Sequence, residues 1–367
     1  MAVTTLRVLI VGAGIAGLAL ARALRQREIT AEVVERVTGW ETTGAGLYLP
    51  GNAVRALGEL GIAATVEPRA NPIGRQRFLD HRGRRLAEVD VTRFWDGVGP
   101  CVAIDRAALQ EALRDADGEF PVRLGASVKA VEAGPAPRVS FSDGSTASYD
   151  LVVGADGVHS TIRRLVMGGP PARYVGQASW RFLAEGFPEI AEWTVMLGRG
   201  HAFLTVALGG GLVYCYADLN TSDPDGARSK DWRPSFAGFA EPVPRLLEQG
   251  GEAYFSPIEE VSPPARTAQR VVLVGDAAHA SSPNMAQGAA MAVEDALVLA
   301  ELLATSSIDE ALSSYRERRA ARVEWVQEQT HRRDRTRSLP PWVRNLTLRL
   351  AAERIFRSNY EPLRELP

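Results

Sequence analysis

Short apolar runs and stretches of helically spaced apolar residues alternate along this chain. The runs occupy residues 8–11, 151–153 and 271–274, and a glycine directly follows each of them. Continuous apolar runs of this length are typical of strands buried on both faces of a parallel sheet. Apolar residues with helical spacing follow over 15–26 and 288–303. The pattern predicts an α/β fold whose parallel sheet is assembled from distant parts of the chain.

A second pattern alternates polar and apolar residues, as in strands with one buried face. It covers residues 75–92, 122–150 and 174–216, and the first two stretches contain hairpin turn signals. Residues 220–233 indicate a polar loop, residues 234–250 one short helix, and the chain ends in helices. We therefore expect a mainly β domain inserted into a Rossmann-like domain built from discontinuous segments, with C-terminal helices.

Composition excludes several classes of function. Apolar residues make up 46% of the chain and charged residues 23%, as in ordinary globular proteins. The net charge of −2 favours neither nucleic acid nor an anionic membrane. An apolar run of about 20 residues, which a membrane span requires, does not occur. Two cysteines and five scattered histidines predict neither a disulfide framework nor a metal site, and they fit a cytoplasmic protein.

The first apolar run ends in Gly-Ala-Gly-Ile-Ala-Gly, residues 12–17, and a second apolar run closes on Glu35 after a helical pattern. Strand, glycine turn, helix, strand and terminal carboxylate form the dinucleotide fingerprint. Gly12 permits the tight turn, Gly14 permits close approach of a pyrophosphate, and Gly17 permits helix–strand packing. The fingerprint alone does not distinguish FAD from NAD. The alternative is a glycine-rich turn without a ligand.

Two later strand ends carry an acid. Asp156 stands in a glycine turn, where it either contacts a ligand of the sheet or caps local N–H groups. Asp276 follows the last apolar run and is placed to accept hydrogen bonds from polyol hydroxyls. His279 is a candidate general base, but a structural role is the commoner one for such a position. The helix that begins near Gly288 directs its positive dipole end to the same region.

Five segments in order resemble the group A flavoprotein monooxygenases, the para-hydroxybenzoate hydroxylase fold family: GAGIAG, GAGL, IDRAALQEAL, GADGVHSTIR and GDAAHASSPNMAQGAAMAVEDA. The resemblance extends over nearly the whole chain and implies that the nucleotide is FAD. It implies an FAD-binding domain made of residues 1–72, 96–172 and 264–337. A substrate domain would comprise 73–95 and 173–263, and a C-terminal helical segment 338–367.

The resemblance also implies which residues hold FAD. Glu35 would bind the adenosine ribose, Arg106 the pyrophosphate and Asp276 the ribityl chain, and Asp156 would contact both FAD and the pyridine nucleotide. The helix start at Gln287 would face the flavin ring. The expected cofactor-binding residues are Gly12, Gly14, Ile15, Ala16, Gly17, Glu35, Arg36, Gly46, Leu47, Arg106, Val128, Asp156, Gly157, Gly275, Asp276, Gln287, Gly288 and Ala289.

The activity implied by the resemblance is hydroxylation of a small aromatic or heteroaromatic molecule. NAD(P)H and O2 would be consumed, and oxygen would be transferred from a flavin C4a-hydroperoxide. The alternatives are epoxidation, oxidative decarboxylation, Baeyer–Villiger-type insertion, or a flavin-binding protein without oxygenase turnover. We expect a monomer or a homodimer without a separate NAD(P)H domain.

The substrate side is predicted from the β-rich segment. Tyr214 and Tyr216 share one face of a strand by alternation. An aromatic-lined pocket with one cation suits a planar phenolic or carboxylated substrate, whereas the alternative is that these aromatic residues fill the core. The expected substrate-binding residues are Arg181, His201, Phe203, Tyr214, Tyr216, Pro283 and Asn284. Arg181 and Tyr214 are also expected to act in catalysis, together with Pro283, which the resemblance places near the flavin edge.

Ala286 and the arginine-rich stretch 316–337 lead to two further predictions. Ala286 precedes Gln287 where the family usually has glycine, and we expect its methyl group to crowd the flavin or restrict its movement. Residues 316–337 contain eight arginines and four acids. Because the acids interleave and no aromatic platform accompanies them, a solvated helix over the flavin domain is favoured over a nucleic-acid surface.

Overall fold

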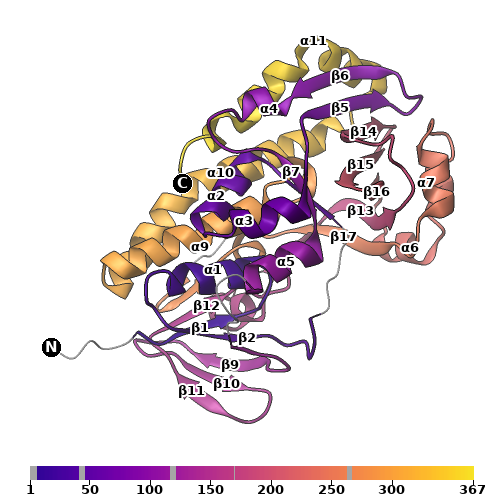
Figure 1. Ribbon diagram of the computed structural model, residues 1–367. Helices are drawn as coiled ribbons and strands as arrows, with labels where there is room; N and C mark the ends of the chain where they lie inside the picture. Colours follow the sequence, from indigo (N-terminus) through magenta and orange to yellow (C-terminus); the bar gives the residue numbers. More distant parts are fainter. Residues whose placement is uncertain (1–5, 41–45, 116–120, 169, 263–266) are drawn as a thin grey trace.

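The computed structural model describes residues 6–40, 46–115, 121–168, 170–262 and 267–367. A parallel sheet forms one end of the molecule, a larger sheet forms the other, and long C-terminal helices run along both (Figure 1). This arrangement confirms the predicted fold, in which distant segments build a Rossmann-like domain around an inserted β-rich domain. The Gly44–Ala45 part of the predicted GAGL turn lies outside the described residues.

The parallel sheet has six strands in the order β18-β19-β12-β1-β2-β8. The strands are β1 (Val8–Val11), β2 (Ala31–Val34), β8 (Val122–Arg123), β12 (Leu151–Gly154), β18 (Thr267–Ala268) and β19 (Val271–Leu273). All pair in parallel except β18, which is an antiparallel edge strand. Helices α1 (Ile15–Arg25), α5 (Arg106–Asp115) and α9 (Gly288–Thr305) pack together beside it. Since the strands are parallel, the chain leaves β1, β2, β12 and β19 at the same edge.

Two three-stranded sheets extend this domain, with orders β3-β7-β4 and β11-β10-β9. Their bounds are β3 (Gly46–Leu49), β4 (Ala70–Pro72), β7 (Val102–Asp105), β9 (Val128–Glu132), β10 (Arg138–Phe141) and β11 (Thr146–Ser148). Short helices α2 (Gly51–Glu59), α3 (Ala63–Val66) and α4 (Val91–Phe94) lie in the same half of the sequence.

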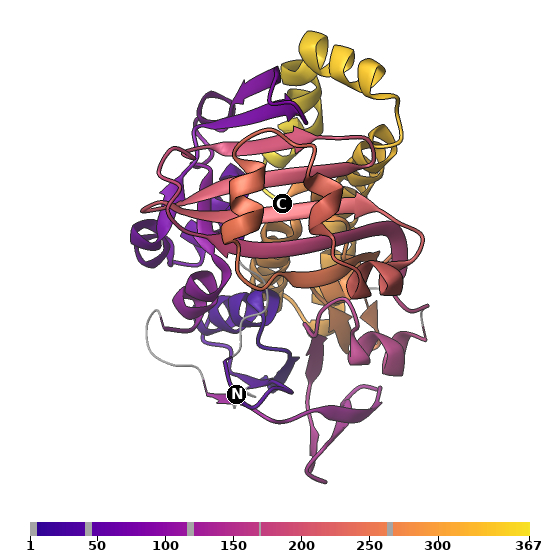
Figure 2. The same cartoon turned by 90° about the vertical axis from the view of Figure 1, so that its right-hand side faces the viewer.

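The larger sheet has seven strands in the order β17-β13-β16-β15-β14-β5-β6. Its strands are β5 (Arg75–Asp80), β6 (Arg85–Asp90), β13 (Arg173–Ala184), β14 (Trp193–Leu197), β15 (His201–Gly209), β16 (Leu212–Asn220) and β17 (Tyr254–Glu260). The early hairpin β5–β6 joins through parallel pairing of β5 with β14. Short helices cover the face of the sheet that is turned toward the viewer in Figure 2. That face buries aromatic side chains such as Trp180, Phe182, Phe203 and Phe236.

The segment from 220 to 250 differs from its prediction. The expected loop contains α6 (Pro224–Ser229), and the expected single helix is split into a 3-10 turn at Arg233–Phe236 and α7 (Val243–Gln249). Asp223 caps α6 by accepting a hydrogen bond from the Gly226 N–H at 2.8 Å. The proline after it occupies the first turn, a position that proline favours.

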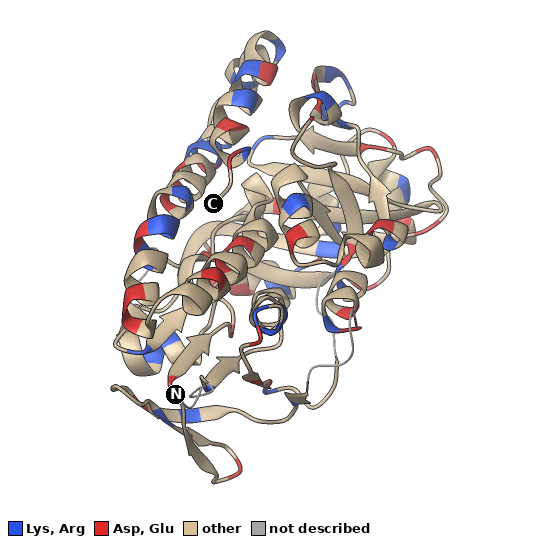
Figure 3. Cartoon of the chain, turned by 60° about the vertical axis from the view of Figure 1, so that its left-hand side comes forward, with Lys and Arg blue, Asp and Glu red and all other residues tan. Residues whose placement is uncertain are grey.

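The C-terminal helices are α10 (Ile308–Thr336) and α11 (Pro341–Tyr360). Ser307 and Glu310 form a capping box that begins α10. Both signs of charge interleave along these helices (Figure 3), as expected for a solvated surface. The prediction was nevertheless wrong for Arg319, whose side chain is fully buried between Glu294 and Asp295 of α9. Helix α11 packs against β6 at the edge of the larger sheet.

Across the described ranges, no helix combines the length and the apolar character that crossing a membrane demands.

Candidate active site

A cavity of about 1170 Å³ lies between the two main sheets. On one side it is bounded by the chain turns that follow β1, β2, β12 and β19, and on the other by one face of the seven-stranded sheet and by α11. The expected cofactor residues that line it are Gly12, Gly14, Ile15, Ala16, Glu35, Arg36, Gly46, Leu47, Arg106, Val128, Asp156, Gly157, Asp276, Gly288 and Ala289. The expected substrate residues that line it are Arg181, His201, Tyr214, Tyr216, Pro283 and Asn284. Gly17, Gly275, Gln287 and Phe203 stand outside this lining.

The three fingerprint glycines have different surroundings. Gly12 has φ +108°, and a β-carbon there would lie 2.4 Å from the Ala155 carbonyl oxygen. A β-carbon on Gly17 would lie 1.9 Å from the Gly12 carbonyl oxygen, so this glycine serves helix–strand packing. Gly14 has nothing within 4 Å of the position where its β-carbon would be. The backbone at Gly14 is therefore open to a ligand in the cavity.

Two helices direct uncapped N-termini toward the cavity. Helix α1 begins after Gly14 and helix α9 after Gln287, and neither N-cap side chain caps its helix. The amide oxygen of Gln287 instead accepts a hydrogen bond from Asn52 at 2.9 Å, which explains why Gln287 is buried outside the lining. First-turn N–H groups without a capping side chain favour an anionic or electron-rich ligand.

Carboxylates stand at three of the strand ends. The Glu35 carboxylate accepts hydrogen bonds from the Ala13 N–H at 2.8 Å and the Val37 N–H at 3.2 Å, which fix it at the end of β2. Asp276 begins the short helix α8 (Asp276–His279) and is exposed to the cavity.

Asp156 accepts local hydrogen bonds and also lines the cavity. Its carboxylate accepts hydrogen bonds from the backbone N–H groups of Thr161 at 2.6 Å and Ile162 at 3.2 Å, and from the Ser160 hydroxyl. Burial raises the pKa of Asp156 above its ordinary value, although these hydrogen bonds oppose the shift. The residue therefore caps a helix start and also lines the cavity.

His279 has a structural environment. Its Nε2 lies 2.7 Å from Oδ2 of the buried Asp295, and the histidine is absent from the cavity lining. Asp295 also accepts hydrogen bonds from the Gly275 N–H at 2.9 Å and Arg319 Nε at 2.7 Å. Burial alone would raise the pKa of Asp295, but the charges of His279 and Arg319 outweigh it and lower that pKa. This network holds the strand–helix turn in which Asp276 stands.

FAD fits the residues of this end of the cavity. The open backbone at Gly14 and the uncapped start of α1 suit a pyrophosphate, with the Arg106 side chain also in the lining. Glu35 and Asp276 supply acceptors for ribose and ribityl hydroxyls. Small side chains at Ala16, Ala289 and Ala292 leave the remaining space open.

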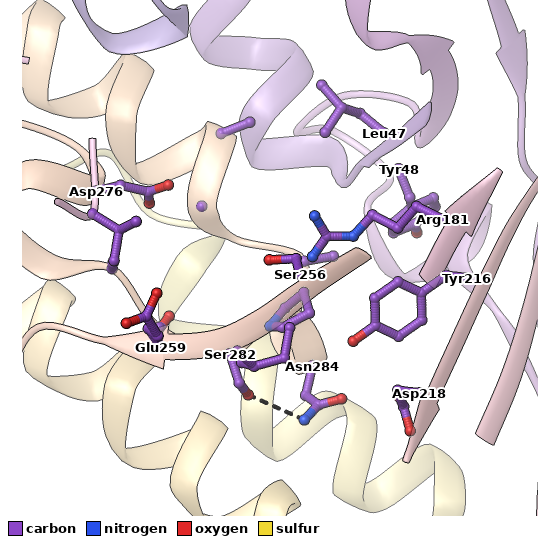
Figure 4. Close-up of a pocket in the computed structure, with 18 of the residues that line it drawn as sticks. Leu47, Tyr48, Arg181, Tyr216, Asp218, Ser256, Glu259, Asp276, Ser282 and Asn284 are labelled. Carbon is purple, nitrogen blue, oxygen red and sulfur yellow. Dashed lines mark hydrogen bonds between the residues drawn. The ribbon is translucent and has the colours of Figure 1, made fainter. Parts of the chain in front are cut away.

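The substrate end of the cavity is a cross-strand row of side chains on one face of the larger sheet. Arg181 pairs with Tyr216, Tyr216 with Leu204, Leu204 with Val195, and Val195 with Phe78. Paired residues of neighbouring strands point to the same face, and all five line the cavity. Figure 4 shows Arg181 and Tyr216 extending into the cavity from these strands.

Two predicted substrate residues belong to the other face. Phe203 pairs with Ala217 and is buried against Phe236, with ring centroids 5.7 Å apart. Phe203 directly precedes Leu204 in the strand, and successive side chains of a strand point to opposite faces of the sheet. The His201 ring packs on Phe236 at 5.6 Å, although the residue borders the cavity. The expectation that the Phe203 side chain contacts the substrate is therefore corrected.

Arg181 and Tyr216 leave polar groups without protein partners. The guanidinium lies 5.5 Å from the centre of the Tyr216 ring, and within the described ranges no carboxylate pairs with Arg181. The Tyr216 hydroxyl is buried without a hydrogen-bond partner among the described residues. Burial raises the pKa of Tyr216, so the phenol stays protonated and able to donate. This pair is suited to an oxygen acceptor on a ligand.

Pro283 and Asn284 line the cavity from the 3-10 turn Pro283–Met285. The Asn284 amide nitrogen donates to the Ser282 hydroxyl at 3.1 Å, as the dashed line in Figure 4 shows, and to Asp334. Its amide oxygen is left to face a ligand, while the exposed Pro283 begins a 3-10 turn.

Sequence reasoning missed the apolar part of the lining. Phe78, Trp193, Val195 and Leu204 come from strands whose two-residue alternation could have placed them on the same face as Tyr216. Helix α11 contributes Leu348, Ile355 and other residues, and it has apolar residues on several faces, so its sequence does not show which face is inward.

Ala286 has an unusual backbone conformation. Its φ of 50° and ψ of 35° lie in the left-handed region, and its methyl group lines the cavity. An L-residue in that region costs about 1–2 kcal/mol, which glycine avoids. The departure from the glycine that the family usually carries therefore introduces local strain.

We expect Ala286→Gly to keep or raise the free energy of unfolding, by up to about 1 kcal/mol, because relief of strain exceeds the added entropy of the unfolded chain. The matched control is Ala321→Gly at an exposed position within α10, which should cost about 1 kcal/mol. Chemical denaturation of both variants measures the difference. Equal destabilisation by the two changes would contradict the strain at Ala286.

Comparisons with known proteins agree with this geometry. A family model described as "FAD binding domain" matches residues 5–172 and 263–330. The chain is 35% identical to an aurachin C monooxygenase/isomerase of Stigmatella aurantiaca, over 88% of this chain and 86% of that protein. It is 33% identical to a 2-heptyl-3-hydroxy-4(1H)-quinolone synthase of Pseudomonas aeruginosa, over 88% and 87%.

A solved structure shares the fold over almost the whole chain. The structure of Klebsiella pneumoniae HpxO complexed with FAD and uric acid superposes with a TM-score of 0.83 at 30% identity, covering 98% of this chain and 92% of that one. Together with the family model, these similarities and the site geometry show that the chain belongs to the group A flavoprotein monooxygenases and is an FAD-dependent enzyme.

Proposed function

We propose that this enzyme uses NAD(P)H and O2 to hydroxylate a small aromatic or heteroaromatic molecule. The observation that carries the proposal is the single cavity that joins the fingerprint glycines to the row containing Arg181 and Tyr216. The names of two similar proteins, one specifying a quinolone and one complexed with uric acid, support a heteroaromatic ring.

Bound FAD would supply electron transfer from NAD(P)H and activation of O2. Gly14, Glu35, Arg106 and Asp276 would hold the cofactor, and the N-terminal end of α9 would favour negative charge on the flavin ring. Pro283 and Ala286 would border the reacting region. The chain itself thus provides binding, orientation and electrostatics.

Arg181 and Tyr216 would orient the substrate. A guanidinium and a protonated phenol on neighbouring strands both donate, so they suit a carbonyl, phenolate or carboxylate oxygen. The seven-stranded sheet would cover one face of the ring and reduce the access of water to it, which would protect a reactive oxidant from loss. Cys101 and Cys215 are both free and buried, which is compatible with the cytoplasm, where NAD(P)H is available.

The test is oxidation of NADH and NADPH by the flavin-loaded enzyme with panels of phenols, aromatic acids, purines and quinolones. We expect at least one ligand to stimulate NAD(P)H oxidation and to be recovered as a hydroxylated product. A panel without any stimulation would argue against the proposal.

For a stimulating substrate, we expect Arg181→Gln to weaken affinity by roughly 10- to 150-fold. A hydrogen bond to a charged group contributes about 1.5–3 kcal/mol, which corresponds to that change. Arg85→Gln, an exposed arginine on β6 that does not line the cavity, is the control. Titration of the flavin absorbance with substrate measures both, and unchanged affinity in Arg181→Gln would exclude this orienting role.

A further inference from the structure

The cross-strand row that contains Arg181 changes character halfway along its length. Its first two residues, Arg181 and Tyr216, are polar, whereas Leu204, Val195 and Phe78 are apolar. Neighbouring strands lie about 4.8 Å apart, so the row extends roughly 14 Å from Tyr216 to Phe78. A ring held by the polar end leaves the apolar part of the cavity uncovered.

The apolar part is lined on two sides. Trp193 extends it from the next row of the sheet, with its ring centroid 5.5 Å from that of Phe78. Helix α11 contributes Leu348 and Ile355 to the lining. We name this region the apolar arm and define it by Phe78, Trp193, Val195, Leu204, Leu348 and Ile355.

Polar groups near the apolar arm are mostly engaged with the protein. The Arg344 guanidinium donates to the carbonyl oxygens of Gly198 at 2.6 Å and Leu197 at 3.2 Å. The Thr347 hydroxyl donates to the Val343 carbonyl at 3.0 Å. Two polar exceptions border it: Gln76, buried on the same face of the sheet, and Tyr48 beside Trp193, whose hydroxyl has no hydrogen-bond partner among the described residues. The arm therefore offers a ligand mainly apolar contact area.

Protein atoms leave the apolar arm partly uncovered at α11. Ile355 is 37% exposed although it lines the cavity. Apolar surface that faces water is costly, and covering it with an apolar ligand recovers about 25 cal/mol per Å². An aliphatic chain attached to the ring has the shape and the chemistry to cover an apolar surface that begins at the polar pair and extends to α11.

We propose that the substrate is a planar aromatic or heteroaromatic ring that carries an aliphatic tail, with the ring at Arg181 and Tyr216 and the tail in the apolar arm under α11. This inference rests on the proposed hydroxylase function, which identifies this part of the cavity as the substrate site. It adds the class of substituent that the site selects.

The test uses the FAD-loaded enzyme and two series of ligands, 4-alkylbenzoates and 2-alkyl-4-quinolones, from the unsubstituted ring to a heptyl chain. Perturbation of the flavin absorbance gives dissociation constants without turnover. Because each buried methylene contributes about 0.8 kcal/mol, we expect a two- to fourfold gain in affinity per methylene in at least one series. If no alkyl ligand of either series binds more tightly than its parent ring, the proposal is overturned.

Two variants of α11 locate the tail. Ile355→Asp places a charge in the apolar arm and should abolish most of the dependence on chain length. Leu350→Asp makes the same change on the same helix at a position that is 77% exposed and does not line the cavity, and it should preserve that dependence. Equal chain-length dependence in both variants would contradict a tail under α11.

Failure of this inference is distinguishable from failure of the hydroxylase function. Affinity that rises with chain length, without NAD(P)H oxidation by any ligand, would support the apolar arm and oppose the hydroxylase. Hydroxylation of bare rings, with no effect of chain length, would support the hydroxylase and overturn the tail.

Discussion

Replacing Arg319 with alanine is expected to lower the free energy of unfolding by about 3–5 kcal/mol, because it removes a buried cation that two buried carboxylates share. Arg319 Nη1 lies 2.9 Å from Glu294, and Nε lies 2.7 Å from Asp295. Both carboxylates are at most 1% exposed. Arg322 would still pair with Glu294 and His279 would still contact Asp295, so the loss reflects weaker neutralisation of two carboxylates that stay buried.

Chemical denaturation with saturating FAD in every sample measures this change, since bound cofactor itself stabilises the folded state. Arg316→Ala, an exposed arginine of the same helix, is the control and should change stability by no more than about 0.5 kcal/mol. Similar unfolding midpoints for the two variants would mean that the buried network does not stabilise the fold as described.

Replacing Gly14 with alanine is expected to weaken FAD binding while leaving the fold intact. A β-carbon at Gly14 meets no protein atom within 4 Å, and φ of −77° is accessible to alanine. The methyl group would instead occupy the space through which a pyrophosphate approaches the start of α1. Overpacking costs about 1–3 kcal/mol, equivalent to a roughly 5- to 150-fold weaker affinity for FAD.

The flavin content of the purified protein and titration of the apoprotein with FAD measure this effect. Gly58→Ala is the matched control, because its β-carbon also meets nothing within 4 Å but lies on an exposed surface of α2. Retention of full FAD affinity in Gly14→Ala would show that the cofactor does not approach the backbone at this glycine.

The nucleotide-binding end of the site was predictable because its chemistry depends on local sequence. A β-carbon at Gly12 or Gly17 would come within 3 Å of a backbone carbonyl oxygen, so only glycine fits at these positions. The motif can therefore be recognised from the spacing of its glycines. The acids at the strand ends follow from the same logic, since parallel strands end at one edge of a sheet. For Asp156 the sequence left two roles open, and the hydrogen bonds show that it caps a helix start.

The substrate end was less predictable because it depends on tertiary packing. Alternation correctly placed Tyr214 and Tyr216 together in the lining, but the face of Phe203 required knowing where β15 begins relative to its neighbours. The sequence of α10 predicted that its arginines face the solvent. The burial of Arg319 depends on the position of α9, which supplies Asp295. No sequence motif marks the residues of α11 that line the cavity. Because this helix has apolar residues on several faces, its sequence does not indicate which face is buried.

The hydroxylase function is tested most directly by the fate of oxygen during turnover with a stimulating aromatic substrate under isotopically heavy O2. We expect NAD(P)H oxidation coupled to a hydroxylated product that carries one heavy oxygen atom. Quantitative release of hydrogen peroxide with an unmodified substrate, or a product whose new oxygen comes from water, would contradict it.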